Sequence, residues 1–268
     1  MKNVTLGKYI PLDSFIHNLD PRTKICAMMV LLVAIFIPCS WYGYAIIGVI
    51  CVVSVLLAKL RIDFIWQSFK PMIFMLVVLT VINVLVLKTG DVLFTIGTFE
   101  VHKDAVMQTV YVVVRLLLMI IITTLLTATT KPLDMTLGIE NLLAPLQKIK
   151  VPTHDIAMMI SLALRFIPTL LEEAERILKA QASRGVDMEN GNLKEKVQSI
   201  LSLIVPLFVS CFQKADDLAD AMEARGYVVG AERVRYKQLK MRFIDWAVLV
   251  FVNVVLAGVI CLKIWVVK

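Results

Sequence analysis

The chain alternates long apolar stretches with shorter polar segments, and this alternation predicts a membrane protein. Its first 24 residues are polar and rich in turn-forming residues. Five apolar stretches follow, each with roughly the 20 residues that an α-helix needs to cross a bilayer. They cover residues 23–40, 42–60, 71–87, 105–130 and 246–267. We therefore predict an all-α, polytopic membrane protein with about five transmembrane helices.

Two other segments depart from this pattern. Residues 88–104, KTGDVLFTIGTFEVHKD, alternate apolar and polar positions between glycines and predict a small β-hairpin. Residues 131–242 are dense in charged side chains and contain three further helical patterns. The first is a short amphipathic helix that ends near Pro145, and the other two are long helices over residues 153–183 and 193–224.

Each long helix has an apolar first part and a charged second part. The second helix contains a charge-free run, SILSLIVPLFVSCF, of 14 residues. Such a run is too short to cross a hydrocarbon core of about 30 Å. Pro168 and Pro206 lie within the two helices and predict a bend near the middle of each. We expect amphipathic helices that begin at the membrane boundary and run outward into the cytoplasm.

The positive charge of the chain indicates its orientation. The net charge is +7, and with a cytoplasmic N-terminus 23 of the 28 Lys and Arg residues lie on the cytoplasmic side. This is the distribution that the positive-inside rule describes. Five spans then place the C-terminus outside the cell. The basic residues are not clustered with aromatic side chains on a soluble surface, so we expect no nucleic-acid partner.

The cysteine and histidine residues do not indicate a metal site. The five cysteines are scattered through apolar runs with no Cys-x-x-Cys pair, which favours a packing role. The three histidines, His17, His102 and His154, are far apart and have no metal-ligand spacing. We predict no bound metal.

Both long helices end on an arginine followed by a glycine. A shift of 41 residues aligns Arg184 with Arg225, Gly185 with Gly226 and several earlier positions of the two helices. Glycine accepts the left-handed conformation that stops a helix, and arginine suits the negative end of the helix dipole. An arginine in this position also offers a rigid fork of donors to a carboxylate.

Two interpretations of these arginines remain open. One is local pairing with acidic residues of the same helix, which would make the Arg-Gly ends ordinary helix stops. The other is docking to a protein that covers the guanidinium groups, because an ion pair left in water contributes less than about 1 kcal/mol.

The sequence lacks the residues that would let this chain supply energy or catalysis. It contains no G-x-x-x-x-G-K-[ST] loop that would cradle nucleotide phosphates. Its spans contain no paired carboxylates and no nucleophile with an adjacent base. A polytopic chain with two long cytoplasmic helices and no catalytic groups is typical of a coupling scaffold.

The two Arg-Gly ends, ASRG at residues 182–185 and EARG at residues 223–226, resemble the paired motifs of a known family. It is the transmembrane T component (EcfT family) of energy-coupling factor (ECF) transporters, which are ATP-binding-cassette-type importers of vitamins and trace nutrients in prokaryotes. The segment HNLDPRTK at residues 17–24 is similar to the opening of the T component. The order of membrane helices, coupling helices and a final span is similar as well, so the resemblance covers essentially the whole chain.

The resemblance implies a transmembrane scaffold between two cytoplasmic ATPase subunits and a vitamin-binding membrane S component. It implies three regions: residues 1–130 with four spans, residues 131–242 with the coupling helices, and residues 243–268 with the final span. ATP and Mg²⁺ would be bound by the ATPase subunits, so this chain would need no cofactor and would not be an enzyme. The residues implied to dock the ATPases are Ser183, Arg184, Gly185, Ala224, Arg225 and Gly226.

The contact with the S component is assigned to small and apolar positions of the coupling helices. These are Met158, Met159, Ala163, Phe208 and Cys211. A second interpretation, that they pack against the spans of this chain, remains open.

Arg115 is the one charged residue inside a predicted span. We expect its side chain to reach toward the outer face, or else to pair with a polar group such as Asn83 or Asn253.

Two other classes of protein compete with the coupling scaffold. An ordinary ABC-type permease would contain its own substrate pathway and a short coupling helix in a loop. A membrane-embedded enzyme would need clustered intramembrane acids or histidines, or a serine with a base, and the sequence contains no such cluster.

Overall fold

The computed structural model describes residues 9–37, 41–86, 92–96, 99–145, 153–186, 192–228 and 239–266. The chain divides into two compact units. Residues 7–142 and 239–268 form the first, which we call the bundle unit. Residues 143–238, with residues 1–6, form the second, which we call the helix-pair unit.

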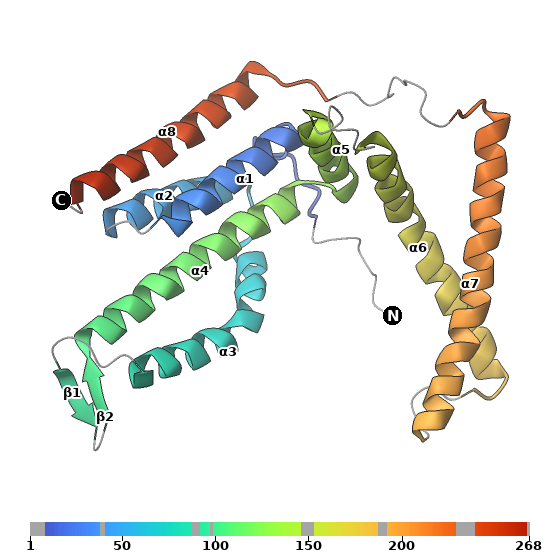
Figure 1. The fold of residues 1–268 in the computed structure, drawn as a ribbon, viewed down its shortest axis with the longest axis horizontal. Coiled ribbons are helices and arrows are strands. Elements are labelled where there is room, and N and C mark those ends of the chain that lie inside the picture. Colours follow the sequence, from blue (N-terminus) through green and yellow to red (C-terminus); the bar gives the residue numbers. More distant parts are fainter. Residues whose placement is uncertain are drawn as a thin grey trace. The chain divides into compact units, whose positions relative to one another are not determined.

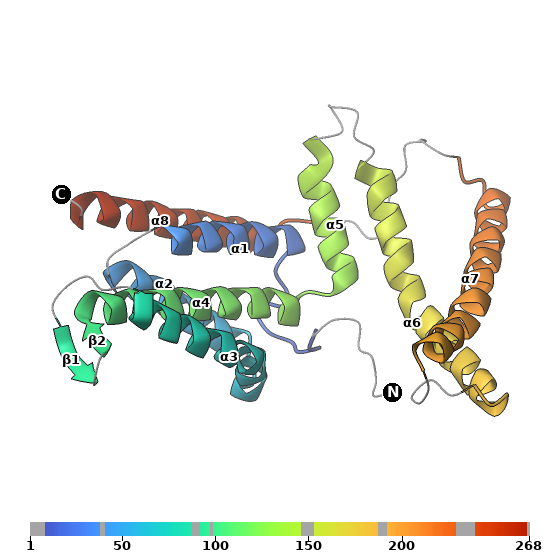
Figure 2. The same ribbon diagram turned by 60° about the horizontal axis from the view of Figure 1, so that its bottom comes forward.

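The bundle unit contains six helices and one hairpin among its described residues (Figures 1 and 2). The prediction of an all-α membrane protein with one small β-hairpin is confirmed, and the two strands pair antiparallel. The elements are α1 (Pro21–Phe36), α2 (Trp41–Leu57), α3 (Ile62–Val86), β1 (Val92–Ile96), β2 (Phe99–His102), α4 (Lys103–Thr129), α5 (Pro132–Leu143) and α8 (Phe243–Val266).

The helix-pair unit contains two long helices. They are α6 (Thr153–Ser183) and α7 (Leu193–Ala224), and their bounds are those that the sequence predicts. Pro168 and Pro206 lie inside the two helices, each of which is one continuous element.

The helices that are long and apolar enough to cross a membrane differ from the predicted set. By length and composition, five helices of the described chain qualify: α3, α4, α6, α7 and α8. The apolar parts of α6 and α7 were predicted to be too short, and by this criterion that prediction is wrong. Two of the predicted spans, α1 with 16 residues and α2 with 17, are instead shorter than the roughly 20 residues of a typical span.

The core of the bundle unit lies among α1, α2, α4 and α8. Ile35, Ile47 and Val259 are fully buried there, and Cys51 lies in the same cluster. Helix α3 packs on α4 at one side of this group, and none of its candidate span is buried. Lipid tails are as apolar as these side chains, so burial alone gives little drive for association, and close packing and hydrogen bonds must hold the helices together.

A network of buried polar groups supplies such bonds where α1, α4 and α8 meet. The Asp245 carboxylate is 2% exposed and accepts hydrogen bonds from the backbone N–H of Asp20 (2.9 Å) and of Arg242 (2.7 Å). The Lys24 ammonium donates to the carbonyls of His17 and Thr129, each at 3.0 Å. The network thus caps the end of α4 and joins the starts of α1 and α8.

The same segment is anchored on its other side by His17. Its Nε2 lies 3.1 Å from the carbonyl of Ile10, which can only accept, so Nε2 carries the proton. Its Nδ1 lies 2.7 Å from the hydroxyl of Ser14. Burial lowers the pKa of His17 below its usual value of 6.5, because the charged imidazolium would lose hydration. HNLDPRTK is therefore a structural clamp of the bundle unit.

Helix α5 lies close against the start of α1 because of one glycine. A Cβ atom on Gly138 would stand 3.1 Å from Ile25 Cδ1 and 3.2 Å from Pro21 Cβ. A larger residue would therefore push α5 away from the bundle.

Replacing Asp245 by alanine is expected to lower the free energy of unfolding by about 3 kcal/mol, because two buried N–H groups lose their acceptor. The measurement is the unfolding midpoint of the full chain in detergent. The matched control is Asp63→Ala, since Asp63 pairs with Arg61 on the surface with 75% of its side chain exposed. Equal midpoints for the two variants would contradict the clamp.

A pH dependence is expected from His17. Its folded pKa is below its unfolded pKa, so the neutral ring contributes stability that is fully present above about pH 6.5 and is lost as the pH falls toward the folded pKa. Between pH 7.5 and 5.5 the wild-type midpoint should therefore fall more than that of His17→Gln, which does not titrate. Parallel curves would show that the imidazole is not held neutral.

Candidate docking site at two helix ends

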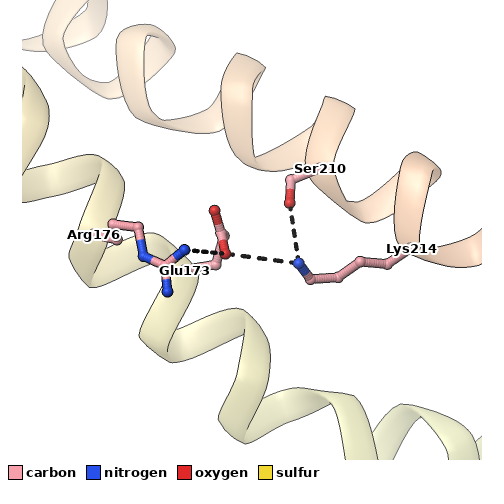
Figure 3. A network of polar contacts seen from close by, with 4 residues as sticks. All are labelled: Glu173, Arg176, Ser210 and Lys214. Atoms are coloured by element: carbon pink, nitrogen blue, oxygen red, sulfur yellow. Dashed lines mark hydrogen bonds and ion pairs between the residues drawn. The ribbon is translucent and has the colours of Figure 1, made fainter.

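Helices α6 and α7 run in opposite directions and contact each other through their charged parts (Figures 1 and 3). Glu173 of α6 faces Lys214 of α7, and Gln181 of α6 donates from Nε2 to the carbonyl of Ser202 at 3.2 Å. A later residue of α6 thus meets an earlier residue of α7, which defines an antiparallel pair. Their C-terminal ends consequently point in opposite directions.

The contact is a small ionic network (Figure 3). Lys214 Nζ lies 3.6 Å from Glu173 Oε2 and 3.4 Å from the hydroxyl of Ser210, and Arg176 Nη1 lies 3.8 Å from the same carboxylate oxygen. The side chains of Glu173 and Lys214 are 21% and 30% exposed, so the pair is partly sheltered. At these distances it contributes no more than about 1 kcal/mol, and its role is to set where the helices cross.

The crossing point relates the two helices by approximate two-fold symmetry. The 41-residue shift that aligns Arg184 with Arg225 also aligns Glu173 with Lys214. The bridging residues therefore occupy equivalent positions, each 11 residues before its arginine. At about 1.5 Å per residue, each arginine lies about 16 Å beyond the bridge along its own helix. The pair presents two equivalent tips at its opposite ends.

The two tips have the same backbone geometry. Gly185 has φ +84° and Gly226 has φ +74°, the left-handed conformation that only glycine adopts at low cost. The N–H groups of Gly185 and Val186 donate to the carbonyls of Ala182 and Gln181, and Gly226 and Tyr227 repeat this pattern on α7. Both helices end in a Schellman motif with the arginine at the last helical position.

The structure does not support local pairing of the two arginines. Arg184 and Arg225 are exposed, and within the described part of the chain neither side chain makes a hydrogen bond or an ion pair. The acids of α6 bind other cations, since Glu175 pairs with Lys179 and Glu173 with Arg176 and Lys214. A Cβ atom on either glycine would meet nothing within 4 Å, so the space around both tips is open.

The other predicted docking residues lie beside the arginines. Ser183 and Ala224 are exposed, and the Ser183 hydroxyl donates to the carbonyl of Lys179 at 3.0 Å. Each tip is therefore a short exposed segment whose guanidinium group is the one cation that its own helix leaves unpaired.

The five residues predicted to contact an S component lie on the apolar parts of the helix pair. Met159 and Phe208 are 57% and 61% exposed, and Ala163 is exposed as well. Met158 and Cys211 are half-buried. The Phe208 ring packs edge-on against Phe212, with centroids 4.7 Å apart.

Arg115 has a partner that the sequence analysis did not identify. Its Nε and Nη2 donate to the hydroxyl of Tyr44 at 3.2 and 2.8 Å, and its guanidinium carbon lies 6.0 Å from the centre of that ring. Neither Asn83 nor Asn253 takes this role, and Asn253 donates to the carbonyl of Leu249 in its own helix. The prediction of a polar partner is correct, but both asparagines are the wrong residues.

The bridge between Glu173 and Lys214 was also missed. The signal was present in the 41-residue repeat, because opposite charges at equivalent positions attract across an antiparallel pair. The searched part of the chain contains no group of three His, Cys, Asp or Glu side chains that could hold a metal ion.

Comparison with known proteins shows similarity over nearly the whole chain. A family model described as "Cobalt transport protein" (CbiQ) matches residues 13–236. A relative from Clostridium kluyveri is 41% identical over 268 residues, which cover 99% of this chain and 98% of the relative. A relative from Bacillus subtilis is 41% identical over 257 residues, covering 96% of this chain and 97% of the relative. Both relatives are named "Energy-coupling factor transporter transmembrane protein EcfT".

Replacing Gly185 or Gly226 by alanine is expected to loosen the helix end by about 1–2 kcal/mol, because a Cβ atom disfavours positive φ. The measurement is hydrogen exchange of the Val186 or Tyr227 amide, which should become roughly tenfold faster, as about 1.4 kcal/mol corresponds to tenfold. The control is Gly258→Ala within α8, where the added Cβ meets nothing within 4 Å and the change should slow exchange nearby. Unchanged exchange in all three variants would contradict the capping role.

Proposed function

Since the chain belongs to the EcfT family, the transmembrane components of energy-coupling factor transporters, we propose that its helix pair couples two cytoplasmic ATPase subunits to a substrate-binding S component. The observation that carries this proposal is the pair of equivalent arginine tips. They are exposed, lack an acidic partner within the described chain, and stand at opposite ends of one crossed helix pair. The names of the relatives do not favour an ordinary permease with its own substrate pathway.

The symmetry of the tips favours two equivalent receptors. Arg184 and Arg225 have the same cap, the same following glycine and the same distance from the crossing bridge. Two copies of one kind of ATPase subunit, related by a two-fold axis, would present two equivalent grooves to them. An acidic groove would suit each guanidinium group, since a covered arginine–carboxylate bond contributes about 1.5–3 kcal/mol.

The helix pair is built to transmit a displacement. Each helix is continuous from its apolar part to its arginine tip, and the two are joined at the Glu173–Lys214 bridge. When the ATPases move the two tips, both helices move as stiff rods about this crossing. The exposed apolar residues, including Met159 and Phe208, would then carry the motion to an S component packed against them.

The orientation and the division of labour follow from the same proposal. The charged halves of α6 and α7 and the N-terminus lie on the cytoplasmic side, in agreement with the positive-inside distribution, and the C-terminus lies outside. The chain itself performs no catalysis. ATP and Mg²⁺ are bound and ATP is hydrolysed by the partner ATPase subunits.

The test is replacement of both arginines by alanine in the full transporter. Each single change should weaken association with its ATPase by about 2 kcal/mol, which is roughly 30-fold. The double change should abolish co-purification of the ATPases, because both anchors are lost, while the chain still reaches the membrane.

The matched control is Arg176→Ala. Arg176 lies on the same helix as Arg184 and is 78% exposed, so its loss removes the same charge without removing a tip. It should leave the complex intact. Normal nutrient uptake in the double variant, or equal losses in the double variant and the control, would refute the docking role.

A further inference from the structure

The bundle unit contains a cavity that the docking mechanism does not use. Its volume is about 370 Å³, and residues of α1, α2, α4 and α8 and of the segment before α1 line it. This is within the range of about 300–1,000 Å³ typical of ligand pockets and more than twice the roughly 150 Å³ that holds a benzene molecule. The lining is almost entirely apolar, so water would lack the polar partners it needs there.

The cavity opens through an apolar rim. Val49, Val53 and Leu57 of α2 and Phe251 of α8 line it and are exposed, whereas Cys51 and Ile122 line it and are buried. In a membrane, lipid tails surround such a rim. A void left empty there would cost the dispersion contacts of every side chain that lines it.

One end of the cavity is polar and lies at the clamp. Thr23 and Lys24 line this end, and both are at least nine-tenths buried. The Thr23 hydroxyl oxygen is buried and has no hydrogen-bond partner among the described residues. A buried hydroxyl without a partner costs about 1–3 kcal/mol, so an acceptor supplied by a ligand would remove a real penalty.

The length of the cavity matches one leaflet of a bilayer. Along α1 its lining runs from Thr23 to Leu31. Eight residues at about 1.5 Å each span about 12 Å, close to half of a hydrocarbon core of about 30 Å. A helix would not fit, because a cylinder about 10 Å wide and 12 Å long fills about 900 Å³.

We propose that this cavity binds one acyl chain of a membrane phospholipid, whose ester carbonyl accepts a hydrogen bond from the Thr23 hydroxyl. The tail lies between α2 and α8 against Cys51 and Ile122. The site selects a neutral acceptor and not an anionic headgroup, because Lys24 already donates to two carbonyls and Asp20, Asp134 and Asp245 act electrostatically on it. The bound chain fills the bundle where α1, α2, α4 and α8 would otherwise enclose a void.

The test uses the full chain in nanodiscs of phosphatidylcholine that contain a small fraction of the same lipid with a photoactivatable diazirine on its acyl chain. After illumination, mass spectrometry locates the crosslinked residues. The expected crosslinks fall on the buried lining of α1, α2 and α4. They should be equally strong when the probe and its surrounding lipid are phosphatidylglycerol, because the headgroup charge is not read.

Two variants test the two parts of the site. Ala27→Phe fills the cavity and should abolish the crosslinks to its lining, and the matched control Ala257→Phe, at an exposed α8 position outside the lining, should preserve them. Thr23→Val keeps the shape of the side chain and removes the unpartnered hydroxyl, so it should fold at least as well as wild type. It should lower the crosslinks about fivefold, the effect of one net hydrogen bond.

Four outcomes would overturn the proposal. Crosslinks spread evenly over the outward faces and insensitive to Ala27→Phe would mean ordinary surrounding lipid. Unchanged crosslinks in Thr23→Val would remove the hydroxyl from the site, and a strong preference for phosphatidylglycerol would contradict a neutral acceptor. Loss of the lipid crosslinks in the assembled transporter, with a protein crosslinked in their place, would make the occupant a protein. None of these outcomes depends on whether Arg184 and Arg225 dock ATPases.

Discussion

The buried carboxylate of Asp245 connects the beginning and the end of the bundle unit. It accepts the N–H of Asp20, 225 positions earlier in the chain, and the N–H of Arg242, where the chain returns after the helix pair. In a bilayer the helices gain little from hiding apolar surface, so such bonds decide their arrangement. Lys24 extends the same network to the end of α4. The point at which residues 143–238 rejoin the bundle unit is consequently held by the opening motif of the chain.

The helix-pair unit achieves its geometry with weak side-chain contacts and strong backbone constraints. The Glu173–Lys214 bridge contributes no more than about 1 kcal/mol. The Schellman caps, by contrast, determine where each helix stops and which residue stands last. Because the backbone forms the cap, the arginine side chain is not needed for it. Both guanidinium groups therefore remain available to a partner, which is the basis of the proposed coupling function.

Local signals predicted the elements accurately, and signals that depend on distant residues did not. The bounds of α6 and α7 followed from helix periodicity and from glycine stops, which act within a few residues. The hairpin followed from its alternation in the same way. The partner of Arg115 could not be found, because Tyr44 is 71 positions away and only the packing of α2 on α4 brings them together. The set of membrane-capable helices was partly wrong because the charged ends of α6 and α7 outweighed their apolar parts.

The sequence by itself determined the class of the protein, the two Arg-Gly tips and the family they indicate, since composition, periodicity and helix stops are properties of neighbouring residues. The tertiary structure decided the antiparallel crossing that separates the two tips and the partners of Asp245, Lys24 and Arg115. It also decided the cavity beside Thr23. Each of these depends on side chains from different helices approaching within a few ångströms, and no local pattern encodes such an approach.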